Sequence, residues 1–287
     1  SANKSELYEI TLQDKKIQNV PIKEYYSNAY TTSEGIAQIL NDVKSNAYAL
    51  NYAMVVSCHG AGWTYKEDWN NYPYSSKKNV FTNRVKQNTE KYIPYYPTRF
   101  YGSVEDLNNY ATNIETLENG ISQAGMKMQF ILFDDCYMAN VETAYQLKNV
   151  TNFLVASTSE VMAIGMPYQT MWSSLASPTP DYQTITNDFY NFYSRYKAPY
   201  GTLSAIDCRQ MDNLARIMKL INANDKFDSK KNNLDSLQVL DGFGKTIFYD
   251  MGDYVDSLCT NKDLLNDFHS TLAQAVRSAV HTDKIYS

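Results

Sequence analysis

Short apolar runs alternate with amphipathic patterns along most of this chain. Consecutive apolar positions predict buried strands over residues 52–58, 128–135, 153–157 and 202–207, and a short edge strand is expected at 6–11. Helical spacing predicts helices over 32–46, 103–124, 138–148, 182–195, 209–224, 246–259 and 262–280. Strands that alternate with helices of this length indicate βαβ units, so we expect an α/β fold with a mainly parallel sheet and helices on both faces.

The segment 64–100 departs from this alternation. It contains Pro73, Pro94 and Pro97 and shows little periodicity. Seven basic and three acidic residues give it a net charge of +4, whereas the whole chain carries −5. A long irregular loop in a compact domain is usually functional or disordered. A functional basic loop and a solvated insertion are both consistent with this pattern.

Composition places the chain among globular proteins and excludes some functions. Hydrophobic residues make up 44% and charged residues 20% of 287 residues, and nothing in the composition marks a domain boundary. We therefore expect a single domain over residues 1–287. The small negative charge argues against nucleic-acid binding. No apolar run approaches the roughly 20 residues that span a bilayer, so no transmembrane segment is expected.

The four cysteines show neither a metal-binding nor a disulfide pattern. No C-x-x-C spacing occurs, which makes a zinc site improbable. A disulfide framework is also unexpected in a chain of this length with so few cysteines. Because Cys58, Cys208 and Cys259 lie in or beside apolar runs, we expect them to be buried, reduced thiols.

The remaining cysteine, Cys136, stands where chemistry is expected. The apolar run 128–135 ends in Asp134 and Asp135 and is followed directly by Cys136, while the run 52–58 is followed by His59 and the glycine-rich residues 60–62. In open α/β sheets, ligands bind at the carboxyl ends of strands. A thiol and an imidazole at that edge predict a nucleophile with its base. The alternative is a core cysteine and a hydrogen-bonded histidine at a strand end.

Local features favour activation of the thiol. Cys136 precedes a predicted helix, and a helix N-terminus and a neighbouring imidazole both stabilise a thiolate. Gly60 has no side chain to obstruct a substrate. The backbone amides of Gly60 and Cys136 are therefore expected to form an oxyanion hole, in which each donor contributes about 3–4 kcal/mol.

Several of these segments resemble the clostripain family of cysteine peptidases. The matching blocks are His-Gly-Ala-Gly-Trp at 59–63, Phe-Asp-Asp-Cys-Tyr-Met at 133–138, Glu-Thr-Ala-Tyr-Gln-Leu at 142–147, and the shorter stretches 157–160, 165–168 and 203–207. The resemblance extends from about residue 50 to 260. The His-Gly and Asp-x-Cys blocks together are fairly specific, whereas either alone would be weak.

The resemblance implies a caspase-like fold, since the family belongs with caspases, gingipains, legumains and separases. That fold is a three-layer sandwich with a mostly parallel central sheet flanked by helices. The family implies a Cys/His dyad that cleaves after Arg or Lys, with Cys136 as nucleophile and His59 as general acid/base. Asp134 would bind the basic P1 side chain through a charge-assisted hydrogen bond, unless it only caps the turn at the strand end.

Asp135 is a departure from the family pattern, in which the middle residue is usually small. An extra carboxylate at this position would either strengthen the selectivity for basic substrates or point into the scaffold and raise the pKa of the thiol.

The family also implies activation by self-cleavage. His59 and Cys136 are 77 residues apart, compared with about 50 in caspases, and the basic loop accounts for the excess. Cleavage in this loop is expected after Lys66, Lys77, Lys78 or Arg84. Relatives often continue into a strand block that resembles Gly-Leu-Ser-Ile-Tyr-Phe-Pro, so we also expect that part of the family's C-terminal region is missing from this chain.

The implied chemistry requires no metal or cofactor. Some relatives respond to calcium, but the acidic stretch 250–253 does not match an EF-hand loop. Relatives are mostly bacterial and exported or surface-tethered, which implies an extracytoplasmic location. Two alternatives remain open: a caspase-fold scaffold protein with an inactive dyad, and a peptidase with another P1 preference.

Overall fold

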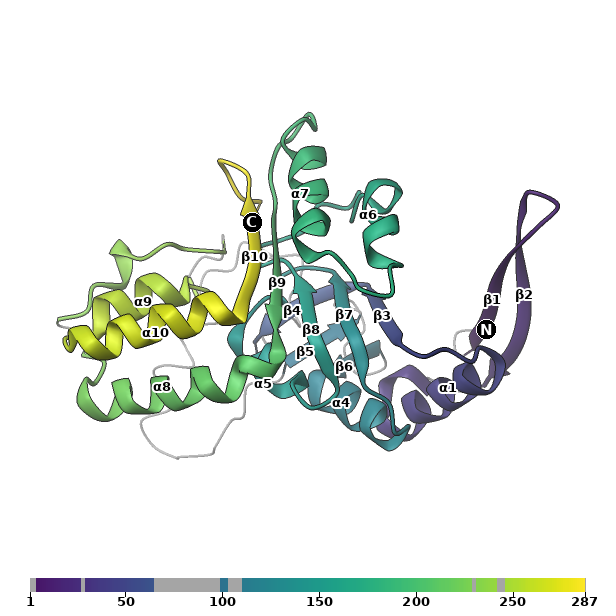
Figure 1. Cartoon of the computed structure of the whole chain (residues 1–287), viewed down its shortest axis with the longest axis horizontal. Helices are drawn as coiled ribbons and strands as arrows, with labels where there is room; N and C mark the ends of the chain where they lie inside the picture. The colour runs from purple at the N-terminus through teal and green to yellow at the C-terminus, as the bar shows by residue number, and fades with distance from the viewer. Residues whose placement is uncertain are drawn as a thin grey trace, which may run out of the picture.

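A five-stranded sheet forms the centre of the molecule (Figure 1). The computed structural model describes residues 4–26, 29–64, 99–102, 110–228, 231–241 and 246–286. In spatial order, the strands are β10 (Val276–His281), β9 (Thr202–Asp207), β8 (Thr151–Ala156), β7 (Met128–Asp134) and β3 (Tyr52–Ser57). All four strand segments that apolar runs predicted for the core are present in this sheet.

Four strands of the central sheet run in one direction. β3 pairs parallel with β7, and β7 pairs parallel with β8, while β9 is antiparallel to both β8 and β10. The predicted α/β fold with a mostly parallel sheet is confirmed, with β9 as the reversed strand. In the β3–β7 register Ser57 lies opposite Asp134. The carboxyl ends of these two strands therefore lie side by side.

Helices cover both faces of this sheet and complete three layers (Figure 1). One face carries α1 (Ser33–Asn46), α4 (Ile114–Gln123), α5 (Val141–Leu147), α8 (Met211–Asn224), α9 (Met251–Leu258) and α10 (Lys262–Ala275). The other face carries α6 (Tyr168–Leu175) and α7 (Tyr182–Tyr193).

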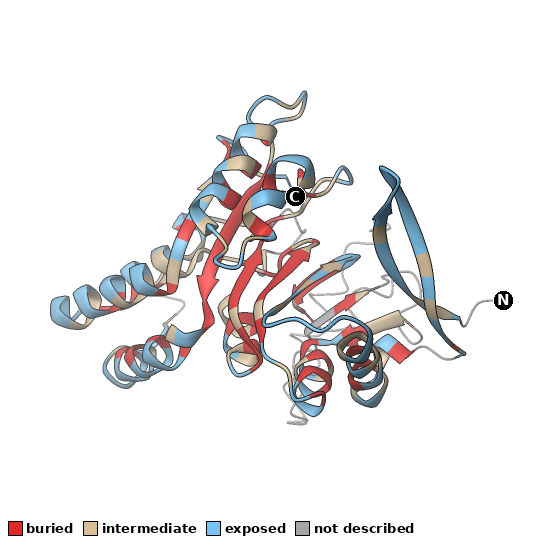
Figure 2. Cartoon of the chain, turned by 45° about the vertical axis from the view of Figure 1, so that its right-hand side comes forward, coloured by how far each residue is buried: buried red, intermediate tan, exposed pale blue. Residues whose placement is uncertain are grey.

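Two apolar cores result from the alternation of side chains along the strands. In β7, Ile131 and Phe133 join the core beneath α1, α4 and α5. Phe130 and Leu132 join the core beneath α6 and α7. Figure 2 shows the central strands as the most buried part of the chain. The same alternation sets the faces of the residues at the end of β7. Asp134, the last residue of the strand, lies on the α6–α7 side, and Asp135, the next residue, lies on the α1–α4 side.

A smaller antiparallel sheet extends from the end of β3. Its strands are β4 (His59–Trp63), β5 (Arg99–Gly102) and β6 (Ala111–Asn113). β4 begins two residues after β3 ends, so the chain leaves the central sheet at Cys58 and His59. The site residues therefore lie at a junction between two sheets.

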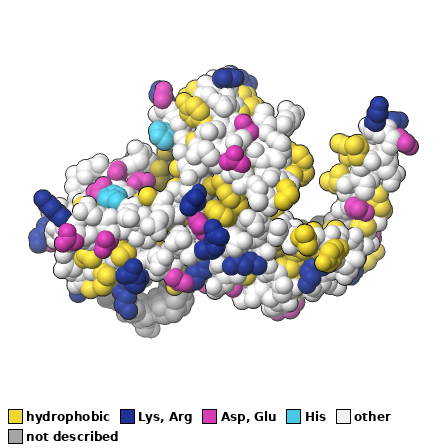
Figure 3. Space-filling model, viewed as in Figure 1, with side chains coloured by type: hydrophobic (Ala, Val, Ile, Leu, Met, Phe, Trp, Pro, Cys, Tyr) yellow, Lys and Arg dark blue, Asp and Glu magenta, His cyan; other side chains and the backbone are white. Residues whose placement is uncertain are grey.

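The N-terminal hairpin of β1 (Ser5–Gln13) and β2 (Lys16–Tyr25) projects from the body of the molecule (Figures 1 and 2). Figure 3 shows apolar side chains on its surface, and Ile10, Leu12 and Ile17 are 73–75% exposed. Lys23 and Tyr25 both bond Asp42 at 2.8 Å, which fixes the base of the hairpin to α1. Only a short strand at 6–11 was predicted here. Among the described helices, none has the length and apolar character that a membrane crossing requires.

Three predicted helices differ from the structure. The prediction for 103–124 is wrong at 111–113, which form β6 and pair with β5 before α4 begins; residues 103–109 lie outside the described part. The prediction for 262–280 is wrong after Ala275, because Val276–His281 pair with β9. In both cases sheet pairing overrides the local helical pattern. The third helix begins at Met251 rather than 246, where Asp250 caps it by accepting the Asp253 amide at 3.0 Å.

Candidate active site

The Cys136 thiol lies just beyond the end of β7, where it is partly buried. The backbone N–H of Val161 donates to Sγ at 3.3 Å, and the thiol donates to the Val161 carbonyl at 3.8 Å. Burial raises the pKa of this thiol to about 12. The Val161 amide opposes that shift, and the neighbouring acidic residues, Glu160 foremost, add to it. The thiol is therefore neutral at pH 7 in this state.

Tyr137 fixes the turn that follows the thiol. Its φ is +62°, a left-handed conformation that is uncommon for a bulky residue. Its amide donates to the Ser159 carbonyl at 3.0 Å, and its hydroxyl donates to Glu160 Oε1 at 3.1 Å. The ring stacks on Phe248 with centroids 4.9 Å apart. Such a conformation costs about 1–3 kcal/mol and persists where the surroundings determine it, typically at functional sites.

His59 is the first residue of β4 and is exposed. Ser57 and Asp134 are paired, and His59 and Cys136 each follow two residues later. The two segments touch, because a Cβ added at Gly60 would overlap the carbonyl oxygen of Cys136. Gly60 is thus required for this approach. The structure brings together the segments that carry His59, Gly60 and Cys136, as their strand-end positions predicted.

Asp134 occupies the α6–α7 side of the site and is half-buried. Its Oδ1 accepts the Met166 amide at 3.2 Å, and its Oδ2 accepts the Tyr168 hydroxyl at 2.8 Å. Gly165, with φ +69°, faces this carboxylate, and a Cβ there would lie 3.1 Å from both oxygens. Burial and the Asp134 hydrogen bond raise the pKa of Tyr168. The loop 165–168 therefore packs directly against this carboxylate.

Asp135 occupies the opposite side and is only 2% exposed. Its Oδ2 accepts the Cys58 thiol at 3.7 Å, and burial raises the pKa of this carboxyl well above its usual range. Of the two expected roles for Asp135, the structure places it in the scaffold, where it is buried and contacts Cys58.

Comparisons with known proteins identify the family of this chain. The profile described as Peptidase_C11: Clostripain family matches residues 2–286. The chain belongs to the clostripain family. No curated protein sequence is significantly similar to it.

Solved structures of clostripain-family enzymes share the fold. A secreted C11 cysteine protease from Bacteroides thetaiotaomicron, "iotapain", is 41% identical over 100% of this chain and 75% of its own, with a TM-score of 0.84. A clostripain from Bacteroides thetaiotaomicron ATCC 29148, in complex with the peptide inhibitor BTN-VLTK-AOMK, is 47% identical over 65% of this chain and 82% of its own, with a TM-score of 0.62. An inactive zymogen C11 protease from Parabacteroides distasonis shares the fold at 23% identity, with a TM-score of 0.71 over 98% of this chain and 70% of its own. This clostripain-family chain is a cysteine peptidase with a caspase-like fold.

The cysteines of this clostripain-family peptidase are all free. Cys208 and Cys259 are buried, as predicted, but the prediction that Cys58 is buried is wrong. Cys58 follows β3, the outermost strand of the central sheet, along which exposed and half-buried residues alternate. The thiol closest in sequence to His59 is therefore on an exposed residue.

Sequence reasoning missed the contacts made by Val161, Tyr168 and Tyr137. They depend on how the loop 157–168 folds over the end of β7, and no periodic pattern in the chain encodes that. The proposed cleavage residues Lys66, Lys77, Lys78 and Arg84 lie outside the described residues. Within the described ranges, no group of three or more His, Cys, Asp or Glu residues is arranged to hold a metal ion.

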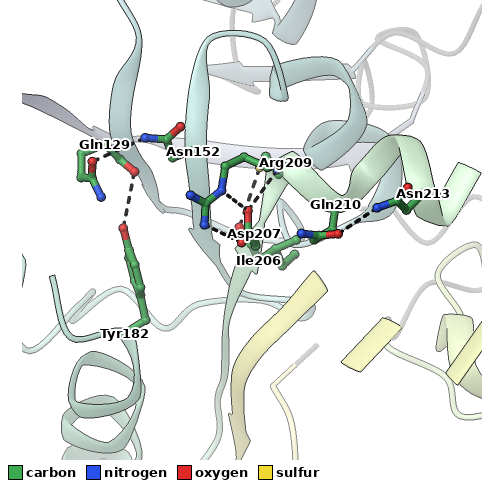
Figure 4. Close-up of polar contacts among 9 residues, drawn as sticks. Gln129, Asn152, Tyr182, Ile206, Asp207, Arg209, Gln210 and Asn213 are labelled. Atoms are coloured by element: carbon green, nitrogen blue, oxygen red, sulfur yellow. Dashed lines mark hydrogen bonds and ion pairs between the residues drawn. The ribbon is translucent and has the colours of Figure 1, made fainter. Parts of the chain in front are cut away.

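A second buried aspartate, Asp207, lies at the end of β9, beside the start of β8 (Figure 4). It is therefore at the opposite ends of the strands from the site; we call this side of the sheet the far edge, and the carboxyl ends of β3 and β7 the site edge. Asp207 is 2% exposed, and its oxygens accept Arg209 Nε and Nη2, each at 2.7 Å. The Arg209 amide adds a third bond at 3.1 Å. The guanidinium also lies over the Phe153 ring, 5.1 Å from its centroid. This carboxylate is neutralised within the scaffold.

Proposed function

We propose that this peptidase cleaves peptide bonds after lysine or arginine, with Cys136 as nucleophile and His59 as general acid/base. The observation that carries the proposal is the β3–β7 register, which sets both residues at equivalent positions beyond adjacent parallel strands. The contact between Gly60 and the Cys136 carbonyl brings the two segments together.

The proposed reaction begins with proton transfer from Cys136 Sγ to the His59 imidazole. The sulfur electron pair attacks the scissile carbonyl carbon, and the backbone amides of Gly60 and Cys136 donate to the resulting oxyanion. Collapse breaks the C–N bond, and His59 returns its proton to the leaving amine. Water then attacks the thioester while His59 accepts a proton from it, which releases the carboxylic acid and restores the thiol.

The contacts of Val161 with the thiol describe the resting state in this proposal. A neutral thiol is a poor nucleophile. Substrate binding is expected to displace the weak bond to the Val161 carbonyl and exclude water, so that proton transfer to His59 accompanies binding.

Asp134 is proposed to select the basic P1 side chain. Its carboxylate is half-buried, and its two neutral donors leave its charge unpaired by any cation among the described residues. The ammonium or guanidinium group of a basic P1 residue would supply the missing positive charge through a short, charge-assisted hydrogen bond. The inhibitor bound by the 47% identical clostripain, VLTK, ends in lysine, which supports a basic P1 residue here.

We further propose activation by self-cleavage after Lys66, Lys77, Lys78 or Arg84. The net charge of +4 over residues 64–100 supports it, because a P1 site that accepts bases would accept this segment. N-terminal sequencing of the purified protein beside Cys136→Ala tests it. The wild-type chain should show a new N-terminus after one of these residues, and an uncut, fully active wild-type chain would dismiss this step.

The proposed chemistry needs neither metal nor cofactor, since side chains supply both the nucleophile and the base. Calcium remains a separate prediction, tested by assays with EDTA and with added calcium. An extracytoplasmic location is proposed from the secreted relative.

The decisive experiment uses fluorogenic peptides with Lys, Arg or Ala at P1. Wild type should hydrolyse the Lys and Arg peptides, and neither Cys136→Ala nor His59→Ala should hydrolyse any of them. Equal turnover of the Ala peptide would indicate a different P1 preference, and full activity of Cys136→Ala would reject the proposed nucleophile.

A further inference from the structure

The proposed reaction does not use the buried carboxyl group of Asp135. Its Oδ2 accepts the Cys58 thiol, and its Oδ1 has no hydrogen-bond partner among the described residues. A buried polar atom without a partner costs about 1–3 kcal/mol, and unsatisfied groups in native structures call for an explanation.

The contacts of Asp135 involve both sequence neighbours of His59. On one side, the Cys58 thiol lies 3.7 Å from Oδ2 and 3.5 Å from the His59 carbonyl oxygen, so its one hydrogen is shared between these two acceptors. On the other, Oδ1 and Cγ lie against the backbone of Gly60, where a Cβ would come within 2.7 and 2.8 Å of them. Asp135 itself immediately precedes Cys136. One side chain therefore spans the two segments that carry the thiol and the imidazole.

We propose that Asp135 is a positioning residue, which holds Cys58 and Gly60 and thereby fixes the backbone of His59 relative to Cys136. The inference rests on the proposed Cys136–His59 pair. The backbone of exposed His59 pairs with Gly102 of β5, and Cys58 and Gly60 flank it, so contacts to these two neighbours also influence where the imidazole lies. Misplacement of a reacting group by about 1 Å can cost roughly 100-fold in rate.

The electrostatic surroundings are compatible with this role. The titratable groups that face Asp135 are Cys58, Asp134, Cys136, Tyr101 and Tyr168, and none of them is a base. Burial and the charge of Asp134 both raise the pKa of Asp135 and favour its neutral form. A neutral carboxyl group can hold Cys58 and Gly60 without placing a second negative charge beside the thiolate.

Four variants test the role: Asp135→Ala, Asp135→Asn, Cys58→Ala and Cys58→Ser. With a Lys fluorogenic peptide, Asp135→Ala should lower kcat by about 10- to 100-fold and change KM by less than about threefold, because the substrate contacts remain. Asp135→Asn keeps the shape and an acceptor oxygen, so it should retain more activity than Asp135→Ala. Cys58→Ala should lower kcat, and Cys58→Ser, whose hydroxyl still donates to Oδ2, should restore it.

Two controls separate positioning from loss of stability. Cys208→Ala removes a buried thiol that follows β9, at the opposite ends of the strands from the site, and should leave kcat unchanged even if its melting temperature falls as far as that of Asp135→Ala. The double variant Asp135→Ala/Cys58→Ala should be no slower than Asp135→Ala, since both changes break the same contact.

The outcomes distinguish this inference from the proposed function. Activity in Cys136→Ala would overturn the proposed nucleophile. If Cys136→Ala is inactive but Asp135→Ala keeps wild-type kcat, or if the effects of Asp135→Ala and Cys58→Ala multiply, the positioning role is wrong. Should Asp135→Ala fail to fold, the Cys58→Ala and Cys58→Ser pair decides, and equal kcat values in these two variants would reject the proposal.

Discussion

Asp135 and Asp207 are two buried aspartates in very different surroundings. Each follows or ends a central strand, and each is 2% exposed. At the far edge, the start of β8 and the end of β9, Arg209 donates two side-chain hydrogen bonds to Asp207 (Figure 4). At the site edge, the carboxyl ends of β3 and β7, Asp135 accepts one weak thiol donor and keeps one oxygen without a partner among the described residues.

The difference indicates that the interactions at the far edge stabilise the fold, whereas those at the site edge leave polar groups poorly satisfied. Burying a charge is tolerated when the charge is paired and hydrogen-bonded, and Asp207 meets that condition. Asp135 avoids the penalty by favouring its neutral form, as the direction of its pKa indicates. An Asp135 oxygen without a partner among the described residues, a left-handed Tyr137 and the partly buried Cys136 thiol lie at the site edge. Such features concentrate at functional sites rather than at structural ones.

The largest expected effect is the loss of activity in Cys136→Ala and His59→Ala. Each should lower kcat/KM for a Lys peptide by at least about 10³-fold, because the bond-forming atom or its proton acceptor is gone. Circular dichroism melting should show folded protein in both cases. Cys259→Ala, which removes a buried thiol away from the site edge, should remain active. Loss of activity in Cys259→Ala without loss of folding would contradict the contrast between the two edges.

The second expected effect concerns pH. Because burial raises the pKa of Cys136 to about 12, the reactive thiolate is scarce at neutral pH and grows as the pH rises. Alkylation of Cys136 by iodoacetamide in the free enzyme should therefore accelerate by about tenfold per pH unit between pH 7 and 9. Peptide mass spectrometry of quenched samples measures that rate. A rate that is already constant above pH 7 would show that the resting thiol is ionised.

The third expected effect concerns substrate choice. Asp134→Asn keeps the size of the side chain but removes its charge, so it should lower kcat/KM for Lys and Arg peptides by roughly 10- to 100-fold. A peptide with glutamine at P1 provides the control, and its slow turnover should not fall. A uniform loss for all peptides would assign Asp134 to the scaffold instead, through its bonds to Met166 and Tyr168.

The smallest effect on activity is expected at the far edge. Arg209→Ala leaves Asp207 buried and unpaired and should lower the free energy of unfolding by about 2–3 kcal/mol, somewhat less than for a fully buried pair. The expected loss is smaller than for a fully buried pair because the Arg209 side chain is 54% exposed and solvent screens its charge. Urea unfolding measures this change, and kcat/KM at low temperature should vary by less than about twofold. A large loss of kcat/KM in folded protein would mean that the two edges are coupled.

The sequence predicted the carboxyl ends of β3 and β7, where the site lies, better than it predicted the two outermost strands of the sheet, β10 and β3. β3 and β7 were identifiable because their apolar residues are consecutive, and the segments that follow them, which carry His59 and Cys136, touch as their positions in the sequence suggested. β10 was not identifiable, since Val276–His281 continue a helical pattern and become a strand only by pairing with β9. The role of Asp135 also stayed open, because the face it occupies depends on where β7 ends. Cys58 was expected to be buried because it lies beside an apolar run. It is exposed because β3 is an outermost strand, and the residues of a strand do not show its place in the sheet.

Covalent labelling tests the central claim most directly, since the two segments that meet at the site carry one thiol each, Cys58 and Cys136. The enzyme would be treated with VLTK-AOMK, and the modified cysteine identified by peptide mass spectrometry. The account predicts the label on Cys136 alone, with much slower labelling in His59→Ala and none in Cys136→Ala. A label on Cys58, or labelling of Cys136 that does not depend on His59, would contradict it.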